Sequence, residues 1–246
     1  MSEVVELNDG SPRPSRTFCM TPTARQIFAH CDEMRQTQRI GLIIGNPGVG
    51  KTTVLREYAR THPGVVMASL TTAFATQRTI VDKLLDAFQI QPWATAFLGK
   101  YQELCSKLWD GGGPYMLIVD EAQEAEKPAL NVLRGLYDDE GLVIVLAGNE
   151  EFRNRRYDAT LSKYAALGSR LGQKLDLPGS TSNDVKVFCH SRNVTDVSCV
   201  AYLTECSKKF GGLRGVEMII ERARILADGE RLTVQLLKEA VRFIGG

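Results

Sequence analysis

Residues 45–52 read Gly-Asn-Pro-Gly-Val-Gly-Lys-Thr and fit G-x-x-x-x-G-K-[ST], the pattern of a phosphate-binding loop. The apolar, β-branched run at 40–44 predicts a buried strand before the loop, and residues 52–60, which lack Gly and Pro, predict a helix after it. In this context the glycines let backbone N–H groups turn toward an anion at the positive end of the new helix. The loop therefore predicts a nucleoside triphosphate site.

Within this loop the expected nucleotide-binding residues are Asn46, Pro47, Gly48, Val49, Gly50, Lys51, Thr52 and Thr53. The ammonium of Lys51 can reach the β- and γ-phosphates, and the hydroxyl of Thr52 can bind Mg²⁺. ATP and Mg²⁺ are the cofactors that we expect.

The composition of the 246-residue chain is that of a globular protein, with 43% hydrophobic and 24% charged residues. The formal net charge is only +1, so any nucleic-acid surface has to be local. The six cysteines form no C-x-x-C pair and have no metal-ligand spacing with the three histidines, which favours a reducing compartment. With no signal peptide and no membrane-length apolar run, we expect a cytoplasmic protein.

Strands and helices alternate through the first two thirds of the chain. Further strands are predicted at 64–70, 115–121, 142–149 and 173–177, and helices at 21–38, 80–88, 101–109 and 128–137. Strands that are apolar throughout and separated by helices predict a parallel sheet covered on both faces, hence an α/β fold. After residue 180 the strand signal stops, and helices are predicted at 183–191, 196–210, 214–227 and 233–244. We expect a flexible leader at 1–15, a nucleotide-binding domain at 16–179 and a small all-helical domain at 180–246.

Polar residues follow two of the predicted strands. Asp120 and Glu121 end an apolar strand, and Asn149 ends the next one. Because ligands bind beyond the carboxyl ends of parallel strands, these residues and the phosphate loop are expected to converge. Asp120 would help Thr52 to hold Mg²⁺, and Glu121 would polarise the attacking water as a general base. Asn149 would orient that water or sense the γ-phosphate, and a plain polar turn after Gly148 is the alternative.

These motifs, followed by Ser169-Arg170 and by Gly212-Leu213-Arg214 in the helical region, resemble those of AAA+ ATPases. The resemblance implies a parallel sheet flanked by helices, followed by a small helical lid. It also implies that Asn149 is the first sensor, that Arg170 reaches the nucleotide of a neighbouring subunit, and that Arg214 touches the γ-phosphate in cis. Cations aimed at the γ-phosphate are what phosphoryl transfer needs. The competitors of Arg170 are Arg153, Arg155, Arg156 and Lys174, and a solvated surface arginine is a further alternative.

Among AAA+ proteins, residues 16–244 resemble the Mu B, TnsC and IstB transposition ATPases. The resemblance rests on the phosphate loop, on Asp120-Glu121-Ala122-Gln123, on Leu146-Ala147-Gly148-Asn149 and on the Gly-Gly-Leu-Arg run. It implies a homo-oligomer, ring or filament, that forms with ATP on duplex DNA without sequence preference, selects target DNA and activates a partner transposase. The chain departs from Mu B in having only a short leader where Mu B has a helix-turn-helix domain.

The family also implies DNA-facing loops after the second strand and before the third. Here they contain Thr71, Thr72, Arg78 and Lys100, whose hydroxyls and cations can contact phosphates. An ordinary polar loop is the alternative for each of these residues. Because a filament sums weak contacts over many subunits, a modest charge per subunit can suffice.

Three other functions fit parts of the sequence. A replication initiator or helicase loader would share the ATPase core, but a winged-helix domain or long helical insertion is not evident. A nucleotide-switch adaptor without DNA would not need Glu121 as a base. A small-molecule kinase fits poorly with the Asp120-Glu121 pair and the helical tail containing Arg214.

Overall fold

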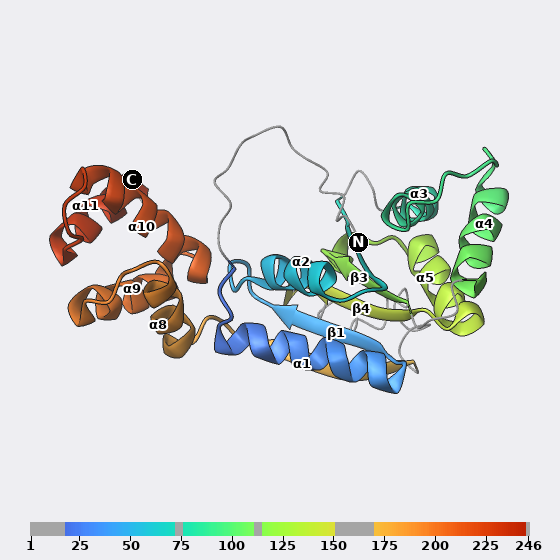
Figure 1. Cartoon of the computed structure of the whole chain (residues 1–246), viewed down its shortest axis with the longest axis horizontal. Helices are drawn as coiled ribbons and strands as arrows, with labels where there is room; N and C mark the ends of the chain where they lie inside the picture. The colour runs from blue at the N-terminus through green and yellow to red at the C-terminus, as the bar shows by residue number, and fades with distance from the viewer. Residues whose placement is uncertain (1–17, 72–75, 111–114, 151–169, 245–246) are drawn as a thin grey trace. The chain divides into compact units, whose positions relative to one another are not determined.

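The structure, a computed structural model, describes residues 18–71, 76–110, 115–150 and 170–244 (Figure 1). The elements of the first part are α1 (Pro22–Thr37), β1 (Ile40–Gly45), α2 (Lys51–Thr61), β2 (Val65–Ser69), α3 (Gln77–Ala87), α4 (Phe97–Asp110), β3 (Met116–Asp120), η2 (Ala122–Glu124), α5 (Lys127–Glu140), β4 (Val143–Gly148) and β5 (Leu171–Leu177). The helical region contains α8 (Ser182–Ser191), α9 (Val197–Lys209), α10 (Gly212–Ala227) and α11 (Val234–Ile244). None of the described helices has the length and apolar character to cross a membrane.

The predicted elements are present, with small differences at their ends. Thr21 caps α1, since its hydroxyl accepts a hydrogen bond from Ala24 N–H at 3.2 Å. Helix α4 begins at Phe97, before the predicted start at Tyr101. It includes Gly99, whose missing side chain leaves room for Ala94, because a Cβ there would lie 2.4 Å from the Ala94 Cβ. The predicted leader lies outside the described residues.

The five described strands form one sheet in the order β2-β3-β4-β1-β5. The pairs β2/β3, β3/β4 and β1/β4 are parallel, which confirms the predicted parallel sheet. In the register, Val119 of β3 pairs with Leu146 of β4, which in turn pairs with Leu42 of β1. The carboxyl ends of these three strands therefore lie at the same edge of the sheet.

Both faces of the sheet are covered, as the apolar strands predicted. Alternate residues of β1, such as Leu42 and Ile44, join a buried core with residues of α3, α4 and α5, which lie together beside the sheet (Figure 1). On the other face, Gly41 packs against α1, where a Cβ would lie 2.6 Å from Met34 Cγ and 2.8 Å from His30 Nε2. Burial on both faces explains why β1, β3 and β4 show no polar alternation. The edge strand β5 is largely exposed or half-buried and contains polar residues such as Lys174 and Asp176.

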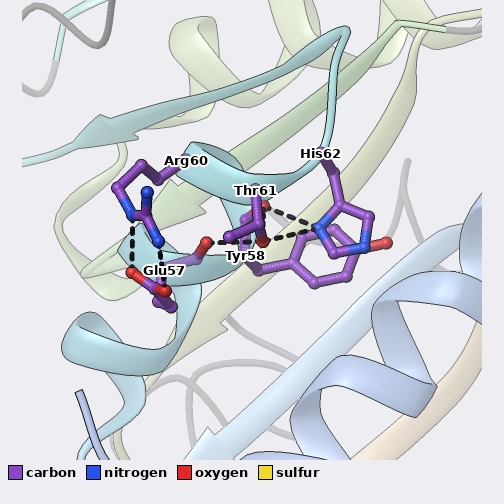
Figure 2. Close-up of polar contacts among 5 residues, drawn as sticks. All are labelled: Glu57, Tyr58, Arg60, Thr61 and His62. Atoms are coloured by element: carbon purple, nitrogen blue, oxygen red, sulfur yellow. Dashed lines mark hydrogen bonds and ion pairs between the residues drawn. The ribbon is translucent and has the colours of Figure 1, made fainter.

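The C-terminal end of α2 is joined to α1 by aromatic side chains. The ring of Tyr58 stacks on the His62 ring at a centroid distance of 3.9 Å, and Phe28 of α1 meets Tyr58 edge to face. The hydroxyl of the fully buried Tyr58 donates to Asp32 of α1 at 2.7 Å. Figure 2 shows the turn that ends α2, in which His62 Nδ1 lies 2.9 Å from Tyr58 O and Glu57 pairs with Arg60. The helix that starts at the phosphate loop is thus held at its far end.

The chain divides into two compact units. One, which we call the sheet unit, comprises Ile27–Ile44 and Thr52–Asp176, together with residues outside the described ranges. The other, the helical unit, comprises Thr17–Gln26, Leu177–Gly246 and also Gly45–Lys51 of the phosphate loop.

The helical unit has a core formed by α8, α9, α10 and α11, with fully buried residues such as Leu203, Val216 and Leu237. A buried carboxylate joins α8 to the start of α1 within this unit. Asp184 accepts hydrogen bonds from Thr23 N–H and hydroxyl, both at 2.8 Å, and from Thr181 N–H at 2.8 Å and hydroxyl at 2.6 Å. Burial by itself would raise the pKa of Asp184, but these hydrogen bonds outweigh it and keep the pKa below its usual value.

A buried histidine makes the stability of the sheet unit sensitive to acid. His30 is only 5% exposed, its Nε2 has no hydrogen-bond partner among the described residues, and burial lowers its pKa to about 4. In the unfolded chain this histidine binds its proton near pH 6.5. The contribution of neutral His30 to the free energy of unfolding is therefore fully present above that pH and is lost as the pH drops toward 4. We expect a loss of about 2 kcal/mol between pH 7 and pH 5 from this group alone.

In the variant His30→Leu, the leucine side chain is similar in size to histidine and does not titrate. Urea denaturation of both proteins at pH 7 and pH 5 should therefore show a smaller pH dependence in the variant. Equal pH dependence of the two proteins would contradict the assignment to His30, since His62 and His190 are common to both.

Candidate nucleotide site

The phosphate loop makes its turn with glycines in the left-handed region. Gly48 has φ 83° and Gly50 has φ 97°, values that L side chains rarely adopt. Lys51 is the first residue of α2 and is buried, and its Nζ donates to Gly45 O at 2.7 Å and to Asn46 O at 3.2 Å. The lysine that is predicted to bind phosphates thus donates its hydrogen bonds to carbonyls of its own loop.

The backbone at Gly50 faces open space. Apart from Gly50 itself and its two chain neighbours, no described residue has an atom within 4 Å of the position that a Cβ would take there. Since α2 starts directly after Gly50, the free N–H groups of its first turn and the positive end of the helix follow the loop. This arrangement suits the close approach of a phosphate to the backbone.

Within the helical unit, the loop is in backbone contact with the start of α10. A Cβ at Gly48 would lie 1.8 Å from Gly211 O, and Arg214 N–H donates to Gly48 O at 3.4 Å. Asn46 Nδ2 also donates to Pro178 O at 2.9 Å. The side chain of Arg214 is exposed in the first turn of α10. Arg214 therefore belongs to the same compact unit as the loop.

Within the sheet unit, Thr52 and Asp120 are in direct contact. The Thr52 hydroxyl donates to Asp120 Oδ2 at 2.6 Å, and the carboxylate, at the end of β3, is 2% exposed. Its other oxygen accepts Glu121 N–H at 3.0 Å. A hydroxyl and a carboxylate are hard oxygen ligands, and Mg²⁺ in nucleotide sites takes one or two carboxylates with phosphates and water. The residues present therefore fit the predicted ion.

Glu121 and Asn149 lie at neighbouring strand ends and share a contact with Gln123. Glu121 adopts the left-handed conformation (φ 53°, ψ 40°) before the short helix η2. Gln123 Nε2 donates to Glu121 Oε2 at 2.5 Å, and Gln123 Oε1 accepts Asn149 N–H at 3.4 Å. No role was predicted for Gln123 from the sequence. No local pattern sets it apart, since its contact with Asn149 spans 26 residues.

Arg170 lies in an ion pair within its own chain. Its Nε donates to Asp138 Oδ1 of α5 at 2.5 Å, and its side chain is 31% exposed. The pairing raises the pKa of Arg170 and lowers that of Asp138. Of the predicted competitors, Lys174 pairs with Asp176 at 2.9 Å, whereas Arg153, Arg155 and Arg156 lie outside the described residues. The role of Arg170 toward a neighbouring subunit stays a prediction.

The residues predicted to face DNA differ in their surroundings. Thr71 follows β2 and is exposed, as is Arg78 in the first turn of α3. Lys100 of α4 donates to Asp82 of α3 at 2.6 Å, and its side chain is 26% exposed. Thr72 lies outside the described residues. Thr71 and Arg78 are therefore accessible to a phosphate, whereas the charge of Lys100 is already partly balanced.

Comparison with known families agrees with this geometry. The pattern described as "AAA domain" matches residues 34–155, and the pattern described as "Mu B transposition protein, C terminal" matches residues 169–243. The chain carries an AAA domain followed by a Mu B C-terminal domain. The first domain contains the phosphate loop, Asp120, Glu121 and Asn149, and the second contains Arg170 and Arg214.

Characterised relatives include two named "ATP-dependent target DNA activator B", from Escherichia phages Mu and D108. Each is 28% identical over 235 residues, which cover 94% of this chain and 74% of the relative. The "Mu-like prophage FluMu DNA transposition protein B" of Haemophilus influenzae is 26% identical and covers 80% of this chain and 69% of its own length. The matches thus extend across both domains.

Solved structures share the fold at low sequence identity. Cdc6p of Pyrobaculum aerophilum has a TM-score of 0.72 at 15% identity, covering 94% of this chain and 69% of that one. The ORC1 protein of Aeropyrum pernix, solved in complex with DNA, has a TM-score of 0.71 at 16% identity, covering 94% and 68%. These likenesses establish the α/β fold of the AAA type.

The contact between Gly48 and Gly211 predicts that the two loop glycines respond differently to alanine. Both substitutions carry the cost of a left-handed backbone, about 1–2 kcal/mol. Only Gly48→Ala also places a methyl group against the Gly211 carbonyl, whereas Gly50→Ala faces open space. We expect Gly48→Ala to lower the melting temperature without nucleotide clearly more than Gly50→Ala does. Equal melting temperatures would show that the loop and the start of α10 are not in contact in solution.

Proposed function

We propose that this chain is a Mg²⁺-dependent AAA ATPase that assembles with ATP on duplex DNA, selects target DNA and activates a partner transposase. The main observation in favour of ATPase activity is the 2.6 Å contact of Asp120 with Thr52, the residue that ends the phosphate-loop motif. The transposition role is supported by relatives named as target DNA activators that match 94% of this chain. The likeness to Cdc6p and ORC1 concerns the fold alone, so a replication function is not proposed.

In the proposed site, Asn46, Pro47, Gly48, Val49, Gly50, Lys51, Thr52 and Thr53 bind ATP. Thr52 and Asp120 hold the Mg²⁺ ion, which when bound balances charge on the phosphates. Lys51 leaves the carbonyls that it contacts here and donates to the β- and γ-phosphates. Arg214 approaches the γ-phosphate from the helical domain of the same chain. We place the boundary of that domain between residues 179 and 180.

Hydrolysis in this proposal is carried by the residues at the strand ends. The Glu121 carboxylate accepts a proton from the attacking water, and Asn149 orients that water or senses the γ-phosphate. Glu121 is exposed, so solvent water reaches its carboxylate. Arg170 acts on the nucleotide of a neighbouring subunit, which would make hydrolysis depend on assembly.

DNA binding in this proposal is weak per subunit and strong per assembly. The net charge of +1 provides no general attraction to DNA, and Lys100 already contacts Asp82. Thr71, Thr72 and Arg78, with Lys100 as a further cation, would contact phosphates along a filament or ring. Repetition of these contacts over many subunits multiplies their effect.

Two substitutions separate ATP binding from hydrolysis. Lys51→Ala should abolish ATP binding and ATP-dependent assembly on DNA. Glu121→Gln should still bind ATP but lose about 10²–10⁴-fold in hydrolysis, because the base is removed while the phosphate loop is intact. Phosphate release with duplex DNA measures turnover. Electron microscopy with DNA and a non-hydrolysable ATP analogue measures assembly.

The matched control is Glu126→Gln, since Glu126 is exposed and makes no side-chain capping hydrogen bond. It should behave as wild type in both measurements. Normal turnover in Glu121→Gln would remove Glu121 from the role of base. If no filaments or rings form on DNA with the analogue, the DNA-assembly proposal fails and a nucleotide-switch adaptor is left.

A mixing experiment tests Arg170 in trans. Arg170→Ala should bind ATP normally but lose about 10³-fold in hydrolysis, as removal of an arginine finger does. Mixed with Glu121→Gln subunits it should regain activity, because some interfaces then combine an intact Glu121 with an intact Arg170.

Asp138→Asn is the control for the ion pair within the chain, since it weakens that pair and leaves the guanidinium in place. It should hydrolyse ATP at close to the wild-type rate. Wild-type hydrolysis by Arg170→Ala, or no recovery on mixing, would direct the search to Arg153, Arg155 and Arg156.

A further inference from the structure

Gln123 is a buried amide whose two polar ends contact two proposed functional residues. It is 4% exposed, its Nε2 lies 2.5 Å from Glu121 Oε2, and its Oε1 lies 3.4 Å from Asn149 N. A carboxylate only accepts and a backbone N–H only donates. The amide therefore satisfies both neighbours in one orientation alone, with its NH₂ group toward Glu121.

The backbone turn that carries Gln123 is held by buried neighbours and by hydrogen bonds. Its neighbours Ala122 and Ala125 are fully buried in the core of the sheet unit. The turn is closed by hydrogen bonds from Glu124 N–H to Glu121 O at 2.9 Å and from Ala125 N–H to Ala122 O at 3.2 Å. Glu121 itself is exposed, so packing does not hold its carboxylate. The short hydrogen bond from Gln123 Nε2 holds the Glu121 carboxylate instead.

The other end of the amide reaches the next strand. Asn149 follows directly after Gly148, the last residue of β4, and β4 is the parallel neighbour of β3. The contact with Asn149 is the longer of the two, and therefore the weaker. A shift of Asn149 would move or release Gln123 Oε1 and, through the rigid amide, change the position of the Glu121 carboxylate.

We propose that Gln123 is a positioning residue that holds the Glu121 carboxylate for water activation and links it to Asn149. This inference rests on the proposed ATPase function of the same site. Gln123 does not contact ATP in this proposal and acts only through Glu121 and Asn149. Its loss should therefore lower kcat and leave ATP binding unchanged.

The first test compares two substitutions that keep the size of the side chain. Gln123→Leu removes both hydrogen bonds, and Gln123→Glu keeps an acceptor for Asn149 N–H but sets a second carboxylate against Glu121. Both should bind a fluorescent ATP analogue with a Kd within about threefold of wild type. Their kcat for ATP should fall about 10–100-fold, the loss expected when a general base is misplaced rather than removed. If Gln123→Leu does not fold, as judged by its melting temperature, Gln123→Glu carries the test.

A double-substitution cycle separates positioning from a merely structural role. In the Glu121→Gln background the carboxylate is already absent, so adding Gln123→Leu or Gln123→Glu should cause little further loss of kcat. Wild-type turnover in the single variants, or the same fold-loss in both backgrounds, would overturn the inference. The proposed function itself would survive that result, since Glu121→Gln alone would still be impaired. Absence of ATP hydrolysis by the wild-type chain would overturn both.

Discussion

Gly48 and Gly50 take backbone φ angles of 83° and 97°, and the turn from β1 into α2 depends on this freedom. A side chain at Gly48 would clash with the Gly211 carbonyl, so glycine is also needed here for the close approach of the two backbones. Because the turn is short, α2 begins at Lys51 and brings the Thr52 hydroxyl to Asp120 at the end of β3. The proposed chemistry at the strand ends starts from this geometry.

Three buried charged side chains in the described part of the chain make hydrogen bonds with neutral groups. Lys51 donates to loop carbonyls, Asp120 accepts the Thr52 hydroxyl, and Asp184 accepts from the hydroxyls and N–H groups of Thr23 and Thr181. Such contacts offset the cost of burying charge. For Asp184 they serve the fold of the helical unit. For Lys51 and Asp120 they are contacts that an anion and a cation can replace, which suits a site for a phosphate and its metal ion.

Two types of contact recur at the proposed site, and they differ in reach. Hydrogen bonds inside the loop and inside the turn at Glu121 come from residues close in sequence. The contacts of Gln123 with Asn149, and of Arg170 with Asp138, join residues 26 and 32 positions apart. The local contacts define what each motif can bind. The distant contacts bring the motifs together, and in the proposed function they are the places where nucleotide state and assembly would influence hydrolysis.

The amino-acid sequence by itself was sufficient to predict the order of helices and strands, the parallel α/β fold, the loop at 45–52 and the carboxylates at 120 and 121. Apolar runs, helical periodicity and glycine positions are local properties, so these predictions needed no contact map. Only the tertiary structure decided the strand order β2-β3-β4-β1-β5, the position of Gln123 between Glu121 and Asn149, and the ion pair of Arg170 with Asp138. It also placed Gly48 against Gly211, 163 positions later in the chain. Each of these features depends on which distant segments pack together. The sequence of a short segment does not specify which other segment it contacts.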